Sequence, residues 1–143
     1  MTGNPAPRLA ELIAACSDPK GPYLIHGNDL NVADRQALQT QLAQLGFYIG
    51  TIDGKAAADE MALIAAIDQA FQFPGYFGKN WNAVDECLAD LSWLSATGYL
   101  CLLLSNVELA KSNQRVYPLF LDVFQTAAAS WQDNSIPFKL LLA

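Results

Sequence analysis

The chain has 143 residues, of which 52% are hydrophobic, and its eight Lys and Arg against fourteen Asp and Glu give a formal net charge of −6. This acidic balance argues against nucleic acid as a direct ligand, because phosphate contacts need clustered basic side chains. The length is enough for a proper core and is most simply explained by one domain. The longest apolar run, at residues 100–104, is too short to span a membrane.

The N-terminal residues and the cysteines together predict a compartment. No basic stretch followed by an apolar block marks a signal peptide at the N-terminus. Cys16, Cys87 and Cys101 include no C-x-x-C pair, and an odd number of cysteines does not form a disulfide framework. Both features predict a protein of the reducing cytoplasm.

The first 46 residues predict a helix, a strand and a second helix. Residues 8–15 have helical spacing of apolar side chains and are followed by a Pro- and Gly-rich break, and residues 23–26 read as a short strand. Residues 32–45 predict a helix ended by Gly46, with an inward stripe formed by Leu38, Leu42 and Leu45. We expect this extension to pack on the same domain as the remainder of the chain.

The rest of the chain, residues 47–143, alternates strands and helices. Strands are predicted at 47–52, 99–104 and 138–142, and helices at 58–71, 82–91 and 116–131. The inward side chains of the first and last of these helices are expected to be Leu63, Ile67, Ala70, Phe71, Val116, Leu119, Phe120, Val123, Phe124, Ala127 and Trp131. The alternation predicts an α/β fold with a small parallel sheet and helical crossovers. The nearly continuous apolar strand at 99–104 predicts burial on both faces.

The most informative segment is a loop rich in Pro, Gly and aromatic residues that leads into the helix at 82–91. Asn80 is placed to cap this helix. At about 100° per residue, one side of the helix is apolar, with Val84, Cys87, Leu88 and Leu91. The opposite side carries Asn82, Asp85, Glu86, Asp90 and Trp93. Such a face would suit the binding of a basic protein partner.

The acidic residues of this helix have two interpretations. Glu86 and Asp90 are four residues apart, a spacing at which like charges repel, and no basic residue occurs between Lys79 and Lys111. The cluster therefore serves either partner binding or simple solubility. Trp93 has two interpretations as well: it is a hot-spot aromatic beside the acids, or the helix ends near Leu91 and Trp93 folds back into the core.

The loop before the helix contributes Tyr76, Phe77 and Gly78. Gly78 can supply a backbone angle that other residues resist. We expect one of the two aromatic side chains to hold the loop against the core and the other to contact the partner. Tyr76 is the better candidate for contact, because its hydroxyl needs water or a partner.

The run Phe-Pro-Gly-Tyr-Phe-Gly-Lys-Asn-Trp-Asn-Ala at residues 73–83 resembles a signature of the barstar family, the small intracellular inhibitors of barnase-type ribonucleases. Within that family the chain resembles in particular a bacterial barstar-related group, and the resemblance covers roughly residues 47–142. It implies a barstar-like fold and a helix that plugs a ribonuclease active site. Positions matching the family's loop are Tyr76, Phe77, Gly78 and Asn80. Glu86 takes the place of the family's most important acid, whereas Asn82 stands where an Asp is frequent and Asp85 replaces an aromatic.

Other chemistries have little support in the sequence. His26 is the only histidine, which excludes a multi-His metal site, and we expect it to be a turn or core residue rather than a member of a catalytic triad. No phosphate loop, nucleophile elbow or zinc spacing occurs. We therefore predict no catalytic residues, no metal and no cofactor. A less favoured alternative is a small Mg²⁺-dependent hydrolase that uses Asp85, Glu86 and Asp90, although acids on one helix rarely converge on an ion.

The sequence as a whole predicts a cytoplasmic, non-enzymatic inhibitor, monomeric when free. Its partner would be a basic ribonuclease or a nuclease toxin, so the protein would act in immunity as an antitoxin. The binding residues would be Tyr76, Phe77, Gly78, Asn80, Asn82, Asp85, Glu86, Asp90 and Trp93. The alternative of another class is an acidic interaction or regulatory module that has the fold without the inhibition.

Overall fold

The computed structural model of the chain describes residues 7–75 and 78–143. Within them the elements are α1 (Pro7–Ser17), β1 (Leu24–His26), α2 (Val32–Gln44), β2 (Phe47–Asp53), α3 (Glu60–Phe71), α4 (Trp81–Asp90), β3 (Gly98–Leu104), α5 (Asn106–Ser112), α6 (Tyr117–Gln132) and β4 (Phe138–Leu142). None of these helices has the length and apolar composition needed to cross a membrane.

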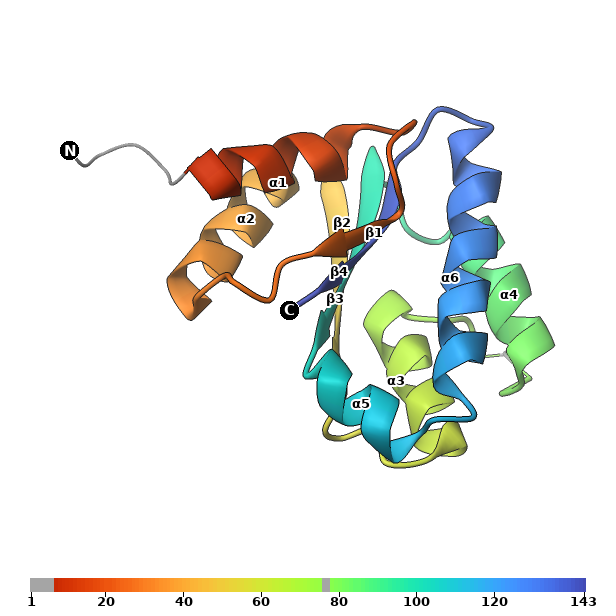
Figure 1. Ribbon diagram of the computed structural model, residues 1–143. Coiled ribbons are helices and arrows are strands. Elements are labelled where there is room, and N and C mark those ends of the chain that lie inside the picture. The colour runs from red at the N-terminus through yellow and green to blue at the C-terminus, as the bar shows by residue number, and fades with distance from the viewer. Residues whose placement is uncertain (1–6, 76–77) are drawn as a thin grey trace.

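The four strands form one parallel sheet in the order β1-β4-β3-β2. Helices cover both of its faces, with α1 and α2 on one side and α3, α4 and α6 on the other, while α5 lies beyond the end of β3 (Figure 1). The predicted α/β fold with a parallel sheet and helical crossovers is therefore confirmed. The N-terminal segment takes part in this sheet, because β1 pairs with β4 at one edge.

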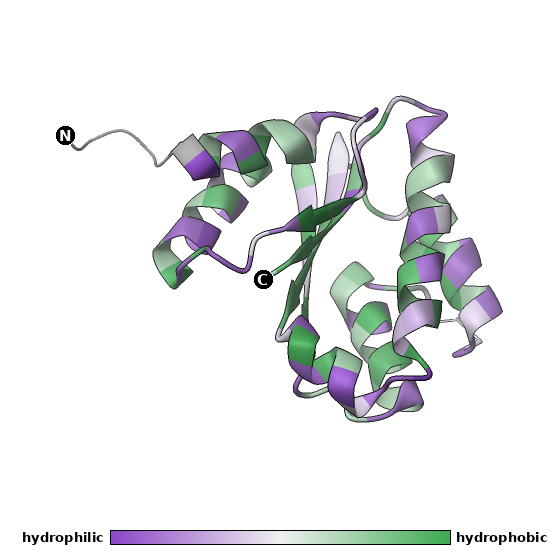
Figure 2. Ribbon diagram, viewed as in Figure 1, coloured by the Kyte–Doolittle hydropathy of each residue, from purple (hydrophilic) through white to green (hydrophobic). Residues whose placement is uncertain are grey.

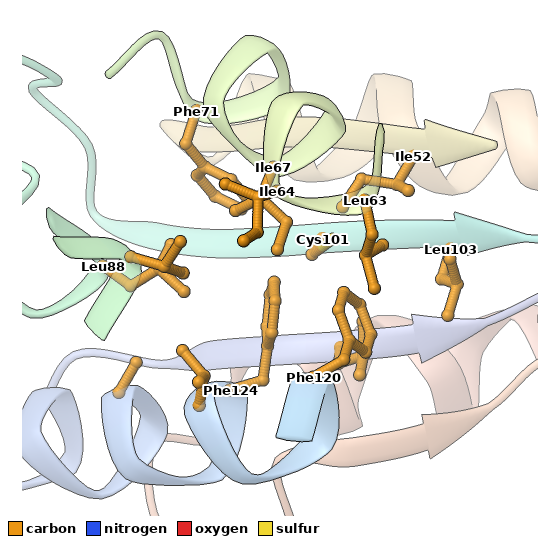
Figure 3. Close-up of a cluster of buried hydrophobic side chains, with 14 of the residues drawn as sticks. Ile52, Leu63, Ile64, Ile67, Phe71, Leu88, Cys101, Leu103, Phe120 and Phe124 are labelled. Carbon is orange, nitrogen blue, oxygen red and sulfur yellow. The ribbon is translucent and has the colours of Figure 1, made fainter. Parts of the chain in front are cut away.

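The larger core lies between the sheet and the helices α3, α4 and α6. Alternate residues of β3 point into it, among them Cys101 and Leu103, and they meet Phe71 of α3 and Phe120 and Phe124 of α6 (Figure 3). Leu88 brings α4 against the same core, so the apolar side of that helix is anchored.

The second core lies under α1 and α2. Leu100 and Leu102, which alternate along β3 with the residues of the larger core, are buried there against leucines of both helices, including Leu12 and Leu38. Strand β3, one of the two inner strands of the sheet, is thus covered on both faces, as its continuous apolar sequence predicts. Much of β3 and β4 is accordingly coloured as hydrophobic, whereas the helices alternate apolar and polar residues (Figure 2).

Lys139 is an exception in this apolar sheet. It is only 2% exposed, and its Nζ donates to the backbone carbonyls of Gly21 and Pro22, each at 3.0 Å. Burial lowers the pKa of this amine, and the nearby Asp18 partly opposes that effect. The loop between α1 and β1 therefore satisfies a buried cation of β4.

Two leucines depart from the sequence prediction. Leu45 is the C-cap residue beyond the end of α2 and is 54% exposed, so the inward stripe of that helix ends at Leu42. Leu119 is 40% exposed because it lies at the margin of the buried stripe of α6, where this helix borders α4. The short helix α5 was not anticipated, and α3 begins two residues later than predicted because Asp59 caps it.

Candidate functional site

The start of α4 is fixed by Asn80. Its Oδ1 accepts from the backbone N–H of Ala83 at 2.8 Å, and its Nδ2 donates to the carbonyl of Gly78 at 3.3 Å. The predicted cap is thus confirmed, and it ties the end of the loop to the first turn of the helix. Tyr76 and Phe77, the aromatic contacts predicted in this loop, lie outside the described residues.

The apolar side of α4 is buried as the helical spacing predicts. Val84, Cys87 and Leu88 face the core, and Leu91 follows as a buried C-cap in the left-handed region, with φ of 46°. The indole N–H of Trp131, from α6, donates to the carbonyl of Leu88 at 2.8 Å. That carbonyl belongs to the last turn of α4, where backbone acceptors have no partner within the helix.

The opposite side of α4 faces solvent. Asn82, Glu86 and Asp90 are exposed, and Asp85 is half-buried at the border with α6. The structure therefore brings together these four predicted site residues on one helix face. Their role in binding a partner stays a prediction.

Trp93 does not extend this face, because α4 ends at Asp90 and the left-handed Leu91 turns the chain. The side chain is half-buried, and its indole N–H donates to the carbonyl of Phe71 at 2.9 Å. Its ring meets that of Phe73 edge-on, with centroids 6.1 Å apart. Of the two interpretations of Trp93, the position in the structure corresponds to the fold-back against the core. A contact of its remaining exposed surface with a partner stays a prediction.

Two further acidic residues, which the sequence pattern does not indicate, lie near α4. Asp68 of α3 lies near Cys87: burial raises the pKa of that thiol, and Asp90, Glu86 and Asp68 add to the rise in that order. Asp122 of α6 lines a groove with Asp85. Asp68 and Asp122 belong to helices that are distant in the sequence, and no local pattern indicates that they approach α4.

The groove between α4 and α6 has a volume of about 240 Å³. Its walls combine three apolar side chains with polar and acidic ones. They are Trp81, Asn82 and Asp85 from α4, and Leu119, Asp122, Val123 and Thr126 from α6. A groove of this make-up could receive a basic side chain, whose apolar stem would contact Leu119 and whose charge would meet the carboxylates.

The carboxylates of α4 take no part in the ion pairs of the described residues. Those pairs join Arg8 to Glu11 and Asp29, and Arg115 to Glu60. Within residues 7–75 and 78–143, moreover, no group of three or more His, Cys, Asp or Glu side chains could hold a metal ion. Among the described residues there is thus no cluster of the kind that a Mg²⁺-dependent hydrolase would need to bind its metal ion.

The comparison with protein families gives one match, in which the family model described as Barstar (barnase inhibitor) covers residues 47–143. The chain belongs to the barstar family. The match begins at β2 and ends after β4, so it includes α3, the whole of α4 and the groove beside α6, whereas α1, β1 and α2 lie outside it. A comparison with curated proteins gave no match.

Membership of the barstar family indicates the class of protein to which the chain belongs. The family is that of the barnase inhibitor, a protein that binds a ribonuclease and is not itself an enzyme.

The three cysteines of this member, Cys16, Cys87 and Cys101, are free and buried, as expected for small apolar side chains rather than disulfide partners. Burial raises the pKa of Cys16 to about 12 and also raises the pKa of Cys101, so neither thiol is a nucleophile at neutral pH.

Proposed function

We propose that this protein inhibits a basic ribonuclease, of the barnase type or a nuclease toxin, by covering its active site with the solvent face of α4. The binding residues are Asn82, Asp85, Glu86 and Asp90, together with the loop residues Tyr76, Phe77, Gly78 and Asn80, and Trp93 at the border. The observation that carries the proposal is that the carboxylates of this face form no ion pair with any residue that the structure describes, on a helix whose opposite side is anchored in the core.

The positions of Glu86 and Asp90 in α4 lower the stability of the free protein. Acidic side chains stabilise the first turn of a helix and destabilise the last one, because of the helix dipole. α4 has no acidic residue in its first turn and no basic residue in its last, where Asp90 lies. Glu86 and Asp90 also repel each other across one helical turn. A binding role accounts for acids in these positions, since the cost is recovered when a cationic partner neutralises them.

The chemistry of the target explains why acids would be used. A ribonuclease holds RNA phosphates with basic side chains, so its cleft is cationic and attracts a carboxylate face. Attraction at long range also speeds association, and the net charge of −6 acts in the same direction. Exclusion of substrate follows because the helix would occupy the phosphate positions.

The test is an inhibition assay with purified barnase and a panel of other basic ribonucleases. Wild type is compared with Glu86→Ala and with Glu108→Ala, which removes the same charge from the first turn of α5, away from the groove. We expect Glu86→Ala to weaken inhibition roughly tenfold or more, the effect of losing an interface hot spot, and Glu108→Ala to leave it almost unchanged. Inhibition by wild type should also weaken as the salt concentration rises.

Two results would contradict the proposal. Equal inhibition by wild type and Glu86→Ala would place the binding surface elsewhere on the molecule. A folded wild type that leaves every ribonuclease of the panel active would favour the alternative, an acidic interaction module that has the fold without the inhibition.

A further inference from the structure

Trp81 is the first residue of α4 and connects this helix to α3. Its indole is half-buried, and the indole N–H donates to Oε2 of Glu60 at 2.7 Å. An indole N–H is a donor only, so a half-buried one needs an acceptor in a fixed place. A carboxylate is the stronger kind of acceptor, because the bond to it is charge-assisted.

The carboxylate of Glu60 is not needed to cap α3, because Asp59 is the N-cap residue and accepts from the backbone N–H of Ala62 at 2.8 Å. It can therefore accept the bond from Trp81. The second carboxylate oxygen of Glu60 accepts from Nη2 of Arg115 at 3.2 Å. The bond from Trp81 and, to a smaller extent, the bond from Arg115 lower the pKa of this carboxyl group. The group is therefore ionised at neutral pH and joins the starts of α3 and α4 to the turn before α6.

Trp81 is also part of the candidate binding surface. Trp81 lines the groove between α4 and α6 next to Asn82 and Asp85. Its indole nitrogen is thus held by α3, and the residue itself is part of the lining of the groove. A change in the side-chain conformation of Trp81 would alter the groove and the first turn of α4 together.

We propose that Glu60 is a positioning residue for ribonuclease binding, one that holds Trp81 in the conformation the partner meets. The inference rests on the proposed function, because it concerns the same surface. Glu60 would act through Trp81 and without touching the ribonuclease. Holding a large side chain before the complex forms reduces the entropy lost on binding, which raises affinity.

The first measurement tests the hydrogen bond from Trp81 to Glu60 in the free protein, by NMR of the indole N–H groups. The three tryptophans provide internal references, since Trp93 donates to Phe71 and Trp131 donates to Leu88. Trp81→Phe assigns the Trp81 resonance. We expect Glu60→Ala to move that resonance and to leave the other two in place, and Glu60→Gln, which keeps an acceptor, to move it less. Glu108→Ala is the matched control and should move none of the three.

The second measurement is the dissociation constant for barnase, or for the ribonuclease of the panel that wild type inhibits best. Unchanged Trp93 and Trp131 resonances establish that each variant is folded. Glu60→Ala should weaken binding about threefold to tenfold, the effect of one lost hydrogen bond, and Glu60→Gln should restore part of it. Glu108→Ala should bind like wild type.

The outcomes separate the two proposals. If wild type binds and Glu60→Ala binds equally well, or if the Trp81 resonance does not respond to Glu60→Ala, the positioning role is wrong while the inhibitor function stands. If wild type binds no ribonuclease, the inhibitor function fails and the positioning role fails with it.

Discussion

Two sets of acidic side chains differ in how their positions affect the helices that carry them. Asp34 and Glu108 lie in the first turns of α2 and α5, and Asp59 caps α3, all positions where a negative charge stabilises a helix. Glu86 and Asp90 have no such benefit, since they lie in the second half of α4. At the scale of single residues, this contrast is the main reason to assign the α4 acids to binding.

Neutralising Glu86 and Asp90 should therefore have opposite effects on stability and on binding. The double variant Glu86→Gln/Asp90→Asn removes the repulsion within α4 and the unfavourable charge near its end. We expect the free energy of unfolding to rise by a few tenths of a kcal/mol, measured by urea denaturation, while ribonuclease inhibition weakens. A variant that is less stable than wild type would show that these carboxylates support the fold.

The carboxyl group of Glu60 should titrate in a way that Trp81 reports. The charged group facing it is Arg115, and the hydrogen bond from Trp81 is the main cause of its lowered pKa. The resulting stabilisation is complete above the ordinary pKa of a glutamate and is lost as the pH falls through the lower pKa of the folded state. The Trp81 indole resonance should thus move with a midpoint below about 4.5, and Glu60→Gln should abolish the step. A midpoint at or above the ordinary value would contradict this.

Local signals in the sequence were enough to predict the central helix of the site. Asn80 is a good capping residue, and the spacing of Val84, Cys87 and Leu88 defines one buried side. Trp93 was ambiguous, because helical spacing cannot show that the left-handed Leu91 ends the helix. Asp68 and Asp122 could not be found, since only tertiary packing brings them close to α4.

At the scale of elements, α4 is held at both ends by tryptophan hydrogen bonds. Trp81 joins its first residue to α3, and Trp131 joins the carbonyl of Leu88 to α6. Neither bond was predicted, because each joins residues at least 21 positions apart. The acidic face is consequently presented by a helix with little freedom to move relative to the core, as preorganised binding requires.

One leucine in the middle of α2 and one just beyond its end allow a matched test of the packing. Leu38 is buried in the core between α2 and the sheet, whereas Leu45 is exposed beyond the end of the helix. Leu38→Ala should lower the free energy of unfolding by about 2–5 kcal/mol, because it leaves a cavity in the core. Leu45→Ala should change it by less than about 0.5 kcal/mol. Equal effects in a urea titration would contradict the arrangement of α2 on the sheet.

At the scale of the whole molecule, the N-terminal segment completes the sheet. Its helices cover Leu100, Leu102 and Leu141, and its loop carbonyls accept from Lys139. The strand order was not predictable from local patterns, because β1 pairs with the last strand of the chain. The alternation of elements was sufficient to predict the parallel sheet itself.

A chain shortened to residues 47–143 should therefore fold poorly, although it contains the whole family match. Removal of residues 1–46 exposes an apolar sheet face and leaves a buried ammonium without its acceptors. We expect aggregation or loss of the cooperative thermal transition, measured by circular dichroism and size-exclusion chromatography. A shortened chain that melts like the full protein would show that the segment is dispensable for folding.

The most direct test of the whole account is a map of backbone amide shifts in the full-length protein on addition of barnase or of the ribonuclease it inhibits best. We predict that the perturbed amides cluster on α4, on the loop before it and on the groove side of α6, and that α1 and α2 remain unaffected. Perturbations centred on α1, α2 and the β1 edge would contradict the assignment of ribonuclease binding to the acidic face of α4.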